Sequence, residues 1–145
     1  MPWWIERTRR LRRYVNRLEV WELERFGRSG LSVVSRQPVA VLATTGRRTG
    51  VTRKTPVTVT PYEDGFLIGG GAGGQKATPD WVVNLRANPR AQLTIRRAVH
   101  DVVVHEPGDT ERARAYAAMV ARVPAVERYE TRSGRALPLF IARDI

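Results

Sequence analysis

Residues 38–60 read PVAVLATTGRRTGVTRKTPVTVT, and this stretch indicates the fold class. A short apolar run, Val39–Thr45, is followed by a turn at Gly46–Gly50 and by Val51–Thr60, where apolar and polar residues alternate. Alternation within a short segment bounded by glycine or proline is typical of a β-strand. The stretch therefore predicts two antiparallel strands joined by a hairpin turn.

Similar short runs continue toward the C-terminus. Further strands are predicted at Phe66–Gly70, Ala91–Arg97, Val99–His105 and Leu137–Ala142, which brings the total to about six. Hairpin spacing favours a mostly antiparallel sheet or small barrel over a doubly wound parallel sheet. Closure into a barrel would also remove exposed strand edges. The expected fold class is thus α+β or mostly β, with six largely antiparallel strands and peripheral helices.

Two helices are predicted between and after these strands. Thr78-Pro79 is typical of a helix start, because a hydroxyl N-cap precedes a proline at the first helical position. This helix should end near Asn88-Pro89. Pro107-Gly108-Asp109 opens a later helix, whose predicted apolar face consists of Ala113, Tyr116, Ala117, Val120 and Ala121.

The segment from Pro2 to about Phe26 predicts an N-terminal helix with two unlike faces. Its apolar residues recur with helical spacing, at Leu11, Tyr14, Val15 and Leu18. Its arginines fall mainly on the opposite side, at Arg9, Arg10, Arg12, Arg13 and Arg17. A basic amphipathic helix suits an anionic membrane surface; the alternative is that its apolar side packs on the barrel. We expect residues 1–30 to form this helix and residues 31–145 the barrel.

Composition narrows the chemistry of the 145-residue chain. The net charge of +11, almost all from arginine, predicts anionic partners. There is no cysteine, and His100 and His105 have opposite parity in one strand, so no metal site is expected. No apolar run is long enough to span a bilayer and no signal-peptide core is present, which predicts a cytoplasmic protein or one peripheral on the inner membrane face.

Four cations stand together in the first hairpin without an acid to neutralise them. They are Arg47, Arg48, Arg53 and Lys54, and the neighbouring Gly46 and Gly50 would let backbone amides approach an anion. Arginine pairs with phosphate through two parallel hydrogen bonds, which fixes orientation as well as adding energy. The hairpin predicts an anion-binding site, and the alternative is a solvated turn.

Other residues suggest a flat ligand. Gly69–Gly74 matches neither the Rossmann nor the Walker glycine pattern, so it would either lie against a ring system or be a plain loop. Trp81 and Asn84 share a helix face, and a buried amide needs partners. Tyr129 could donate a proton to a substrate. Since no hydrolytic motif is present, a bound cofactor would supply the chemistry.

Two motifs together resemble the deazaflavin-dependent nitroreductase family, whose members use coenzyme F-420. The first runs from Thr44 to Pro56, and the second is Trp81-x-x-Asn84-Leu85-x-Ala87-Asn88-Pro89. The resemblance implies a split β-barrel that transfers a hydride from the reduced deazaflavin to a quinone or an enone, with Tyr129 as proton donor. It implies these cofactor-binding residues: Arg47, Arg48, Thr49, Gly50, Arg53, Lys54, Thr55, Pro56, Val57, Gly69, Gly70, Gly71, Ala72, Asp80, Trp81 and Asn84.

The chain departs from the nitroimidazole-reducing members. Gly71 and Ala72 stand where those members have serine and lysine, and Val123 and Val126 replace two tyrosines, which argues against nitroimidazole reduction. The expected partners are a small-molecule acceptor and, through the N-terminal helix, an anionic membrane; the protein should be a monomer or homodimer. The alternatives are an FMN- or haem-binding split barrel and a basic nucleic-acid-binding module, although no nucleic-acid motif is present.

Overall fold

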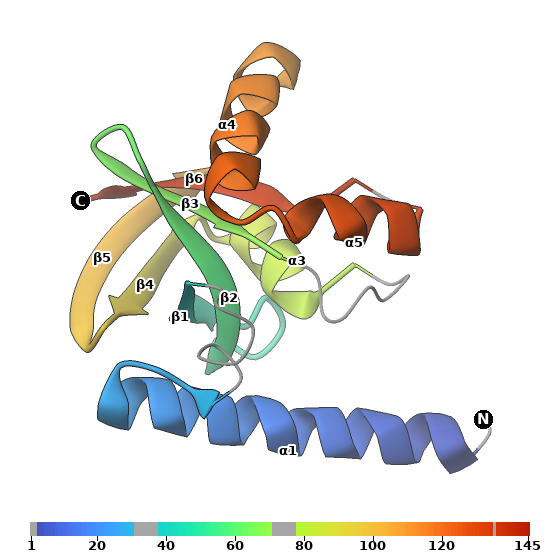
Figure 1. The fold of residues 1–145 in the computed structure, drawn as a ribbon. Helices are drawn as coiled ribbons and strands as arrows, with labels where there is room; N and C mark the ends of the chain where they lie inside the picture. Colours follow the sequence, from blue (N-terminus) through green and yellow to red (C-terminus); the bar gives the residue numbers. More distant parts are fainter. Residues whose placement is uncertain (1–2, 31–37, 71–77, 135) are drawn as a thin grey trace.

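Six antiparallel strands close into a barrel in the computed structural model, in the order β1-β2-β3-β6-β5-β4 (Figure 1). Because β1 pairs with β4 as well as with β2, the barrel has no open edge. The predicted fold class is confirmed. The strands are β1 (Val39–Thr45), β2 (Thr52–Tyr62), β3 (Gly65–Gly69), β4 (Arg90–Ile95), β5 (Ala98–His105) and β6 (Leu139–Asp144).

The structure describes the backbone of residues 3–30, 38–70, 78–134 and 136–145. Within these ranges, the side chains of residues 3–9, 129, 132 and 133 are not described. The helices are α1 (Trp3–Phe26), α3 (Asp80–Ala87), α4 (Asp109–Arg122) and α5 (Val126–Ser133).

The barrel interior is a packed apolar core. Alternate residues of β1 and β2 point inward, among them Ala40, Leu42, Val57 and Val59. They meet Phe140 of β6 and one side of α3, which adds its own apolar residues to the same cluster: Trp81, Val82 and Leu85. The interior is therefore filled with side chains.

A second apolar cluster covers the outside of the barrel under α4 and α5. It joins Met119 of α4 and Val126 of α5 to the outward residues Leu67, Leu139 and Ile141. The first four residues of β6 are consequently buried on both faces, which accounts for their apolar sequence, LFIA. At the other end of β3, a Cβ at Gly65 would overlap the carbonyl oxygen of Ala142, so a side chain cannot fit there.

The start of α3 differs from the prediction. Pro79 is the N-cap residue, with φ −59° and ψ 146°, and no side chain caps the helix. Because that ψ is extended, the first helical residue is Asp80, whose carboxylate lies in the first turn and is favoured there by the helix dipole.

The late helices also differ. The buried face of α4 holds Ala115 and Met119, whereas the predicted Ala113, Ala117 and Ala121 are exposed. Alanines occur on several sides of this helix and bury little surface each, so the larger Met119 decides which side packs. The short helix α5 was not predicted, because its sequence VERYETRS is mostly polar. Strand β6 begins two residues later than expected.

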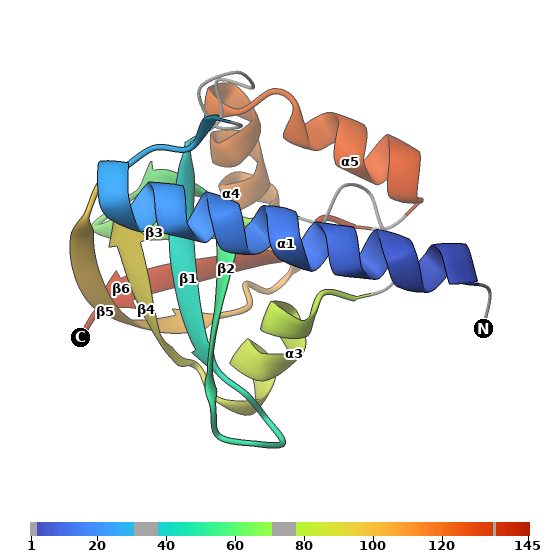
Figure 2. The same cartoon turned by 90° about the horizontal axis from the view of Figure 1, so that it is seen from below.

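Helix α1 crosses β1 and β2 on the side of the barrel opposite α4 (Figures 1 and 2). Its buried residues are Glu19 and Leu23, not the predicted apolar face. Leu11, Tyr14 and Leu18 are exposed. The alternative in which this apolar side packs on the barrel is therefore not what the structure shows; another side of the helix faces the barrel, where Leu23 is buried and Glu24 pairs with Lys54 of β2. In the described part of the chain, neither this helix nor any other is long and apolar enough to cross a membrane.

Candidate functional site

The turn between β1 and β2 is closed by its own hydrogen bonds. The amide of Gly46 donates to the carbonyl of Val51 at 2.8 Å, and the amide of Gly50 donates to the carbonyl of Gly46 at 2.9 Å. Gly50 has φ +71°, which favours glycine. The Thr49 hydroxyl accepts from the amide of Val51 at 3.2 Å. These amides are engaged within the turn, so the turn offers an anion its arginine side chains in preference to them.

Asn84 of α3 connects this turn to the barrel. Its Oδ1 accepts from the backbone amide of Arg47 at 3.2 Å and from Arg47 Nη1 at 3.1 Å. Its Nδ2 donates to the hydroxyl of Thr44 at 3.3 Å. Asn84 is 3% exposed, so the expected buried amide has found its partners. A neutral oxygen thus orients the guanidinium group while leaving its charge intact.

Asp80 forms an ion pair with Arg47. Its Oδ1 lies 3.7 Å from Arg47 Nη2, and its side chain is 90% exposed. Exposed pairs of this kind contribute about 0–1 kcal/mol to stability. An incoming anion that makes two parallel hydrogen bonds to Arg47 could displace this carboxylate at small cost.

Strand register separates the remaining cations. Arg53 is paired with Thr44 across the hairpin, so the two side chains lie on the same face, which is also the face that Asn84 contacts. Lys54 has the opposite parity, and its Nζ lies 2.9 Å from Glu24 Oε1 of α1. Arg53 therefore shares a face with Thr44, which Asn84 contacts, whereas the ammonium of Lys54 is turned toward α1.

Three further predicted residues have clear packing roles. Trp81 is 8% exposed, and its ring centroid lies 5.8 Å from that of Phe140. A Cβ at Gly69 would lie 2.8 Å from Met119 Sδ, so α4 accounts for that glycine. Val57 belongs to the interior core. Gly71, Ala72 and the side chain of Tyr129 lie outside the described residues, although the backbone of Tyr129 belongs to α5.

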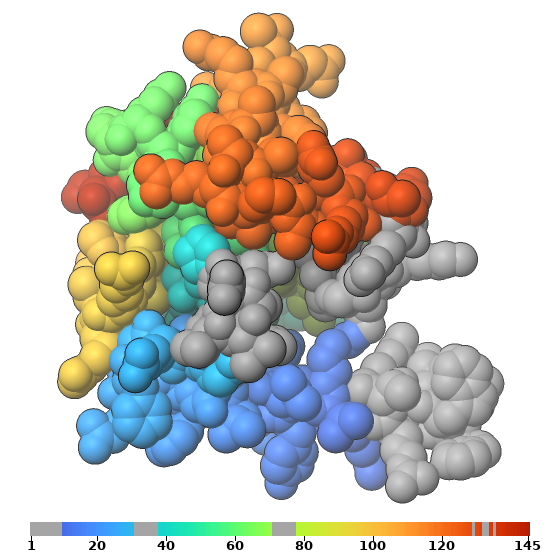
Figure 3. Space-filling view, viewed as in Figure 1, coloured from blue at the N-terminus to red at the C-terminus, as the bar shows by residue number. Residues whose placement is uncertain are grey.

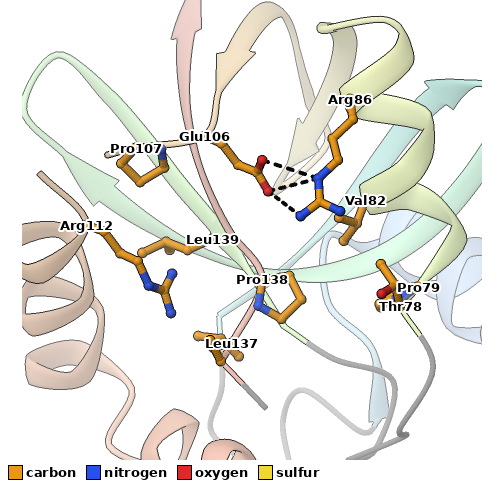
Figure 4. A pocket seen from close by; sticks show the side chains of 11 residues that line it. Thr78, Pro79, Val82, Arg86, Glu106, Pro107, Arg112, Leu137, Pro138 and Leu139 are labelled. Carbon is orange, nitrogen blue, oxygen red and sulfur yellow. Dashed lines mark hydrogen bonds and ion pairs between the residues drawn. The ribbon is translucent and has the colours of Figure 1, made fainter. Parts of the chain in front are cut away.

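A cavity of about 290 Å³ opens on the other flank of α3 (Figure 4). Arg86 and Glu106 meet at its edge through hydrogen bonds of 2.6–3.2 Å, and Glu106 raises the pKa of the Arg86 guanidinium. Among the predicted cofactor-binding residues that the structure describes, none lines this cavity. The sequence did not indicate this cavity, because its walls come from four distant segments: Thr78–Pro79 with Val82 and Arg86, Glu106–Pro107, Arg112, and Ala136–Leu139.

Tyr116 is a second tyrosine of interest, missed from the sequence because it was counted as an apolar residue of α4. Burial raises the pKa of its hydroxyl, and the charge of Glu130 raises it further. Glu130 itself accepts from Arg112 at 3.3 Å and from the amide of Leu137 at 3.0 Å. This carboxylate thus ties α4, α5 and the start of β6 together beside the cavity.

No group of three or more potential metal ligands occurs in the part of the chain that the structure describes. His100 pairs with Asp144 at 3.3 Å, and His105 pairs with Glu111 at 3.0 Å. Each histidine has one acidic neighbour of its own.

Comparison with known proteins adds independent findings. A family model described as F420H(2)-dependent quinone reductase matches residues 15–144. An F420H(2)-dependent quinone reductase of Mycobacterium tuberculosis is 28% identical over 118 residues, which cover 79% of each chain.

Two solved structures are similar as well. One, an F420-H2 dependent reductase, is 26% identical with a TM-score of 0.65, over 73% of this chain and 94% of that one. Another, described as a domain-swapped dimer, is 26% identical with a TM-score of 0.67, over 97% of each chain.

Proposed function

The chain belongs to the F420H(2)-dependent quinone reductase family, and from that premise we propose that it binds reduced coenzyme F-420 at the β1–β2 hairpin. The proposed reaction is hydride transfer to a small oxidised acceptor such as a quinone or an enone. The observation that carries the proposal is the Arg47 guanidinium, which a buried neutral amide orients on the same hairpin that carries Arg48 and Arg53.

The donor chemistry of the hairpin fits the coenzyme, whose phosphate and acidic tail are anionic. Arg47 enters the complex already oriented, so less side-chain entropy is lost on binding. Arg48 and Arg53 are exposed and lie one on the turn and one on β2, so they can approach an anionic arm from two directions. Asp80 pairs with Arg47 until the anion replaces it.

The remaining residues are assigned by the same proposal. Thr55, Pro56 and Val57 of β2, with Gly69 at the end of β3 and Gly70 directly after it, would run beside the flat ring. When bound, the coenzyme supplies the hydride, and the chain's task is to hold donor and acceptor in contact, which can contribute roughly 7–11 kcal/mol. Tyr129 or a water molecule would deliver the proton to the reduced acceptor.

Titration with purified coenzyme tests the binding site. We expect Arg53→Ala to weaken binding at least about tenfold, because a charge-assisted hydrogen bond is lost. Arg114→Ala, which removes an exposed arginine of α4, is the matched control and should bind like the wild type. Binding should also weaken as salt is added. Equal binding by Arg53→Ala and the wild type would show that the proposed clamp is wrong.

Turnover is tested separately with a panel of quinones and enones, by following the loss of absorbance of the reduced coenzyme. Tyr129→Phe should slow turnover without weakening coenzyme binding if the hydroxyl delivers the proton. A protein purified with a flavin spectrum or a Soret band would instead support the FMN- or haem-binding alternative.

We propose a monomer or a homodimer as the solution state, and light scattering decides between them. A similar structure is described as a domain-swapped dimer. The cytoplasmic location expected from the sequence stays a prediction that cell fractionation tests.

A further inference from the structure

The cavity on the outer flank of α3 has the size of a site for a small molecule. Its volume of about 290 Å³ lies at the lower end of the range of ligand pockets, about 300–1,000 Å³. One water molecule takes about 30 Å³ in the liquid, so a ligand of up to about ten non-hydrogen atoms fits. None of the described residues of α1 lines the cavity. Figure 3 shows α1 (blue) on the opposite side of the molecule from α4 (orange), which supplies one wall.

Most of the cavity wall is apolar. Three of its side chains, Val82, Leu137 and Leu139, are at most 2% exposed. The others are three prolines, at positions 79, 107 and 138. Because proline has a fixed φ, these parts of the wall lose little freedom when a ligand binds. An apolar group that displaces poorly held water from such a wall gains affinity. The body of a fitting ligand is therefore apolar.

Arg112 of α4 is the charged group of the wall that has donors to spare. A guanidinium has five N–H donors. Among the described residues, Arg112 makes one hydrogen bond, from Nη2 to Glu130 Oε1 at 3.3 Å. That distance is longer than the roughly 2.7–2.9 Å of a strong charge-assisted bond. The group lies 5.8 Å from the ring centroid of Tyr116, and in Figure 4 it points from α4 toward Leu137. It therefore offers a cation at the cavity that its neighbours use only in part.

Arg86, on the α3 side of the cavity, is already satisfied. Its Nε donates to both carboxylate oxygens of Glu106, at 3.0 and 3.2 Å, and its Nη2 donates to Oε1 at 2.6 Å. This pair carries no net charge, so Arg112 leaves the wall with a single excess positive charge. A ligand with one negative charge balances it. A doubly charged phosphate would meet repulsion from Glu106 and from Glu130, which borders the cavity.

We propose that this cavity binds a small monocarboxylate with an apolar body. The carboxylate accepts hydrogen bonds from the Arg112 guanidinium, whose planar fork of donors matches its two oxygens. The apolar body lies against Leu137, Leu139 and the prolines of the wall. The site is separate from the β1–β2 hairpin, since Asn84 carries the contacts of α3 to that hairpin and does not line the cavity. The proposal therefore does not rest on the proposed function.

Glu130 is the internal competitor for the ligand. Its Oε1 accepts from Arg112 and from the amide of Leu137, at 3.3 and 3.0 Å. Glu130→Gln keeps an oxygen that accepts both bonds but removes the negative charge beside the incoming carboxylate. We expect this variant to bind the carboxylate at least about threefold more tightly, because repulsion between like charges is lost.

Calorimetric titration of the full chain with sodium benzoate, in a buffer without other carboxylates, tests the site. Benzoate should bind at a single site, and benzamide, which has the same shape without the charge, at least about tenfold more weakly. Arg112→Met keeps the apolar stem and should also bind benzoate at least about tenfold more weakly. The matched control is Arg122→Met, which removes an exposed arginine at the end of α4 and should bind like the wild type.

Benzoate should also shift the amide resonances of Val82 and Leu137 in the wild type, which locates the binding. Circular dichroism and thermal unfolding show whether the variants fold. If Arg112→Met does not fold, the benzoate–benzamide comparison and Glu130→Gln decide. A wild type that does not prefer benzoate would overturn the proposal, as would unchanged binding by a folded Arg112→Met or weaker binding by Glu130→Gln. Because no coenzyme is present, these outcomes leave the proposed function untouched.

Discussion

Replacing Asn84 by alanine should weaken both the fold and the proposed coenzyme site. The substitution removes the acceptor for two Arg47 donors and the donor to Thr44. Thr44 is 2% exposed, so its hydroxyl would lose this partner away from water. An unpaired buried polar group costs about 1–3 kcal/mol. For a domain of this size, that corresponds to a melting temperature lower by about 2–12 °C.

The same substitution should reduce coenzyme affinity. Arg47 would then have to be ordered at the moment of binding, and ordering such a side chain costs about 0.5–1.5 kcal/mol. The expected dissociation constant is therefore about 2- to 12-fold higher. Thermal unfolding and fluorescence titration of Asn84→Ala measure the two effects on one preparation.

A control variant and a double-mutant cycle test whether Asn84 acts on coenzyme affinity through Arg47. Asn88→Ala removes an amide at the end of the same helix, whose oxygen accepts from the amide of Arg90, and should leave affinity unchanged. In the double variant Arg47→Ala/Asn84→Ala, the losses of affinity should not add, because Asn84 acts through Arg47. If Asn84→Ala bound and melted like the wild type, or if the losses added fully, the role assigned to this amide would be refuted.

Three other substitutions test the stability of the fold and the arrangement of the proposed coenzyme site. Gly65→Ala should prevent folding or strongly destabilise the barrel, since the new methyl group overlaps the Ala142 carbonyl. Soluble yield and thermal unfolding measure this effect, and a melting temperature near that of the wild type would contradict it. Burial raises the pKa of Glu19, so the contribution of this carboxyl to stability is present in acid and is lost as pH rises through the raised pKa. Glu19→Gln should therefore stabilise the fold near neutral pH and stabilise it less in acid. A difference in melting temperature that does not depend on pH would count against this. Lys54→Ala should weaken coenzyme binding less than Arg53→Ala, because Lys54 pairs with Glu24 on the other face; titration that ranks them in reverse would reject this arrangement.

Local pattern was sufficient for the barrel strands. Val39–Thr45 has the same bounds in sequence and structure, because alternation and flanking turn residues are properties of the segment itself. Helix α5 escaped prediction because its eight residues are mostly polar, and neighbours in space stabilise it. The side of α1 that faces the barrel was left open for a related reason, since Lys54 and Glu24, which pair across it, are 30 residues apart.

The candidate site was also predictable from the sequence only in part. Asn84 was a reasonable candidate because it shares a helix face with Trp81, and a buried amide must be satisfied. The sequence did not reveal that its partner is Arg47, 37 positions earlier. Likewise, Arg86 and Glu106 meet only because α3 and the end of β5 lie side by side in the fold. Pairs this distant carry no periodic signal.

The filled interior of the barrel has a consequence for how such a protein can diverge. Since Phe140, Leu42 and their neighbours occupy the space between the strands, there is no room for a ligand at the centre. Selection for a new reaction partner must therefore act on the rim, where turns and helix ends can change without loss of the foldable framework. The strands and the core between them can be inherited together, while the turns and helix ends at the rim change many times.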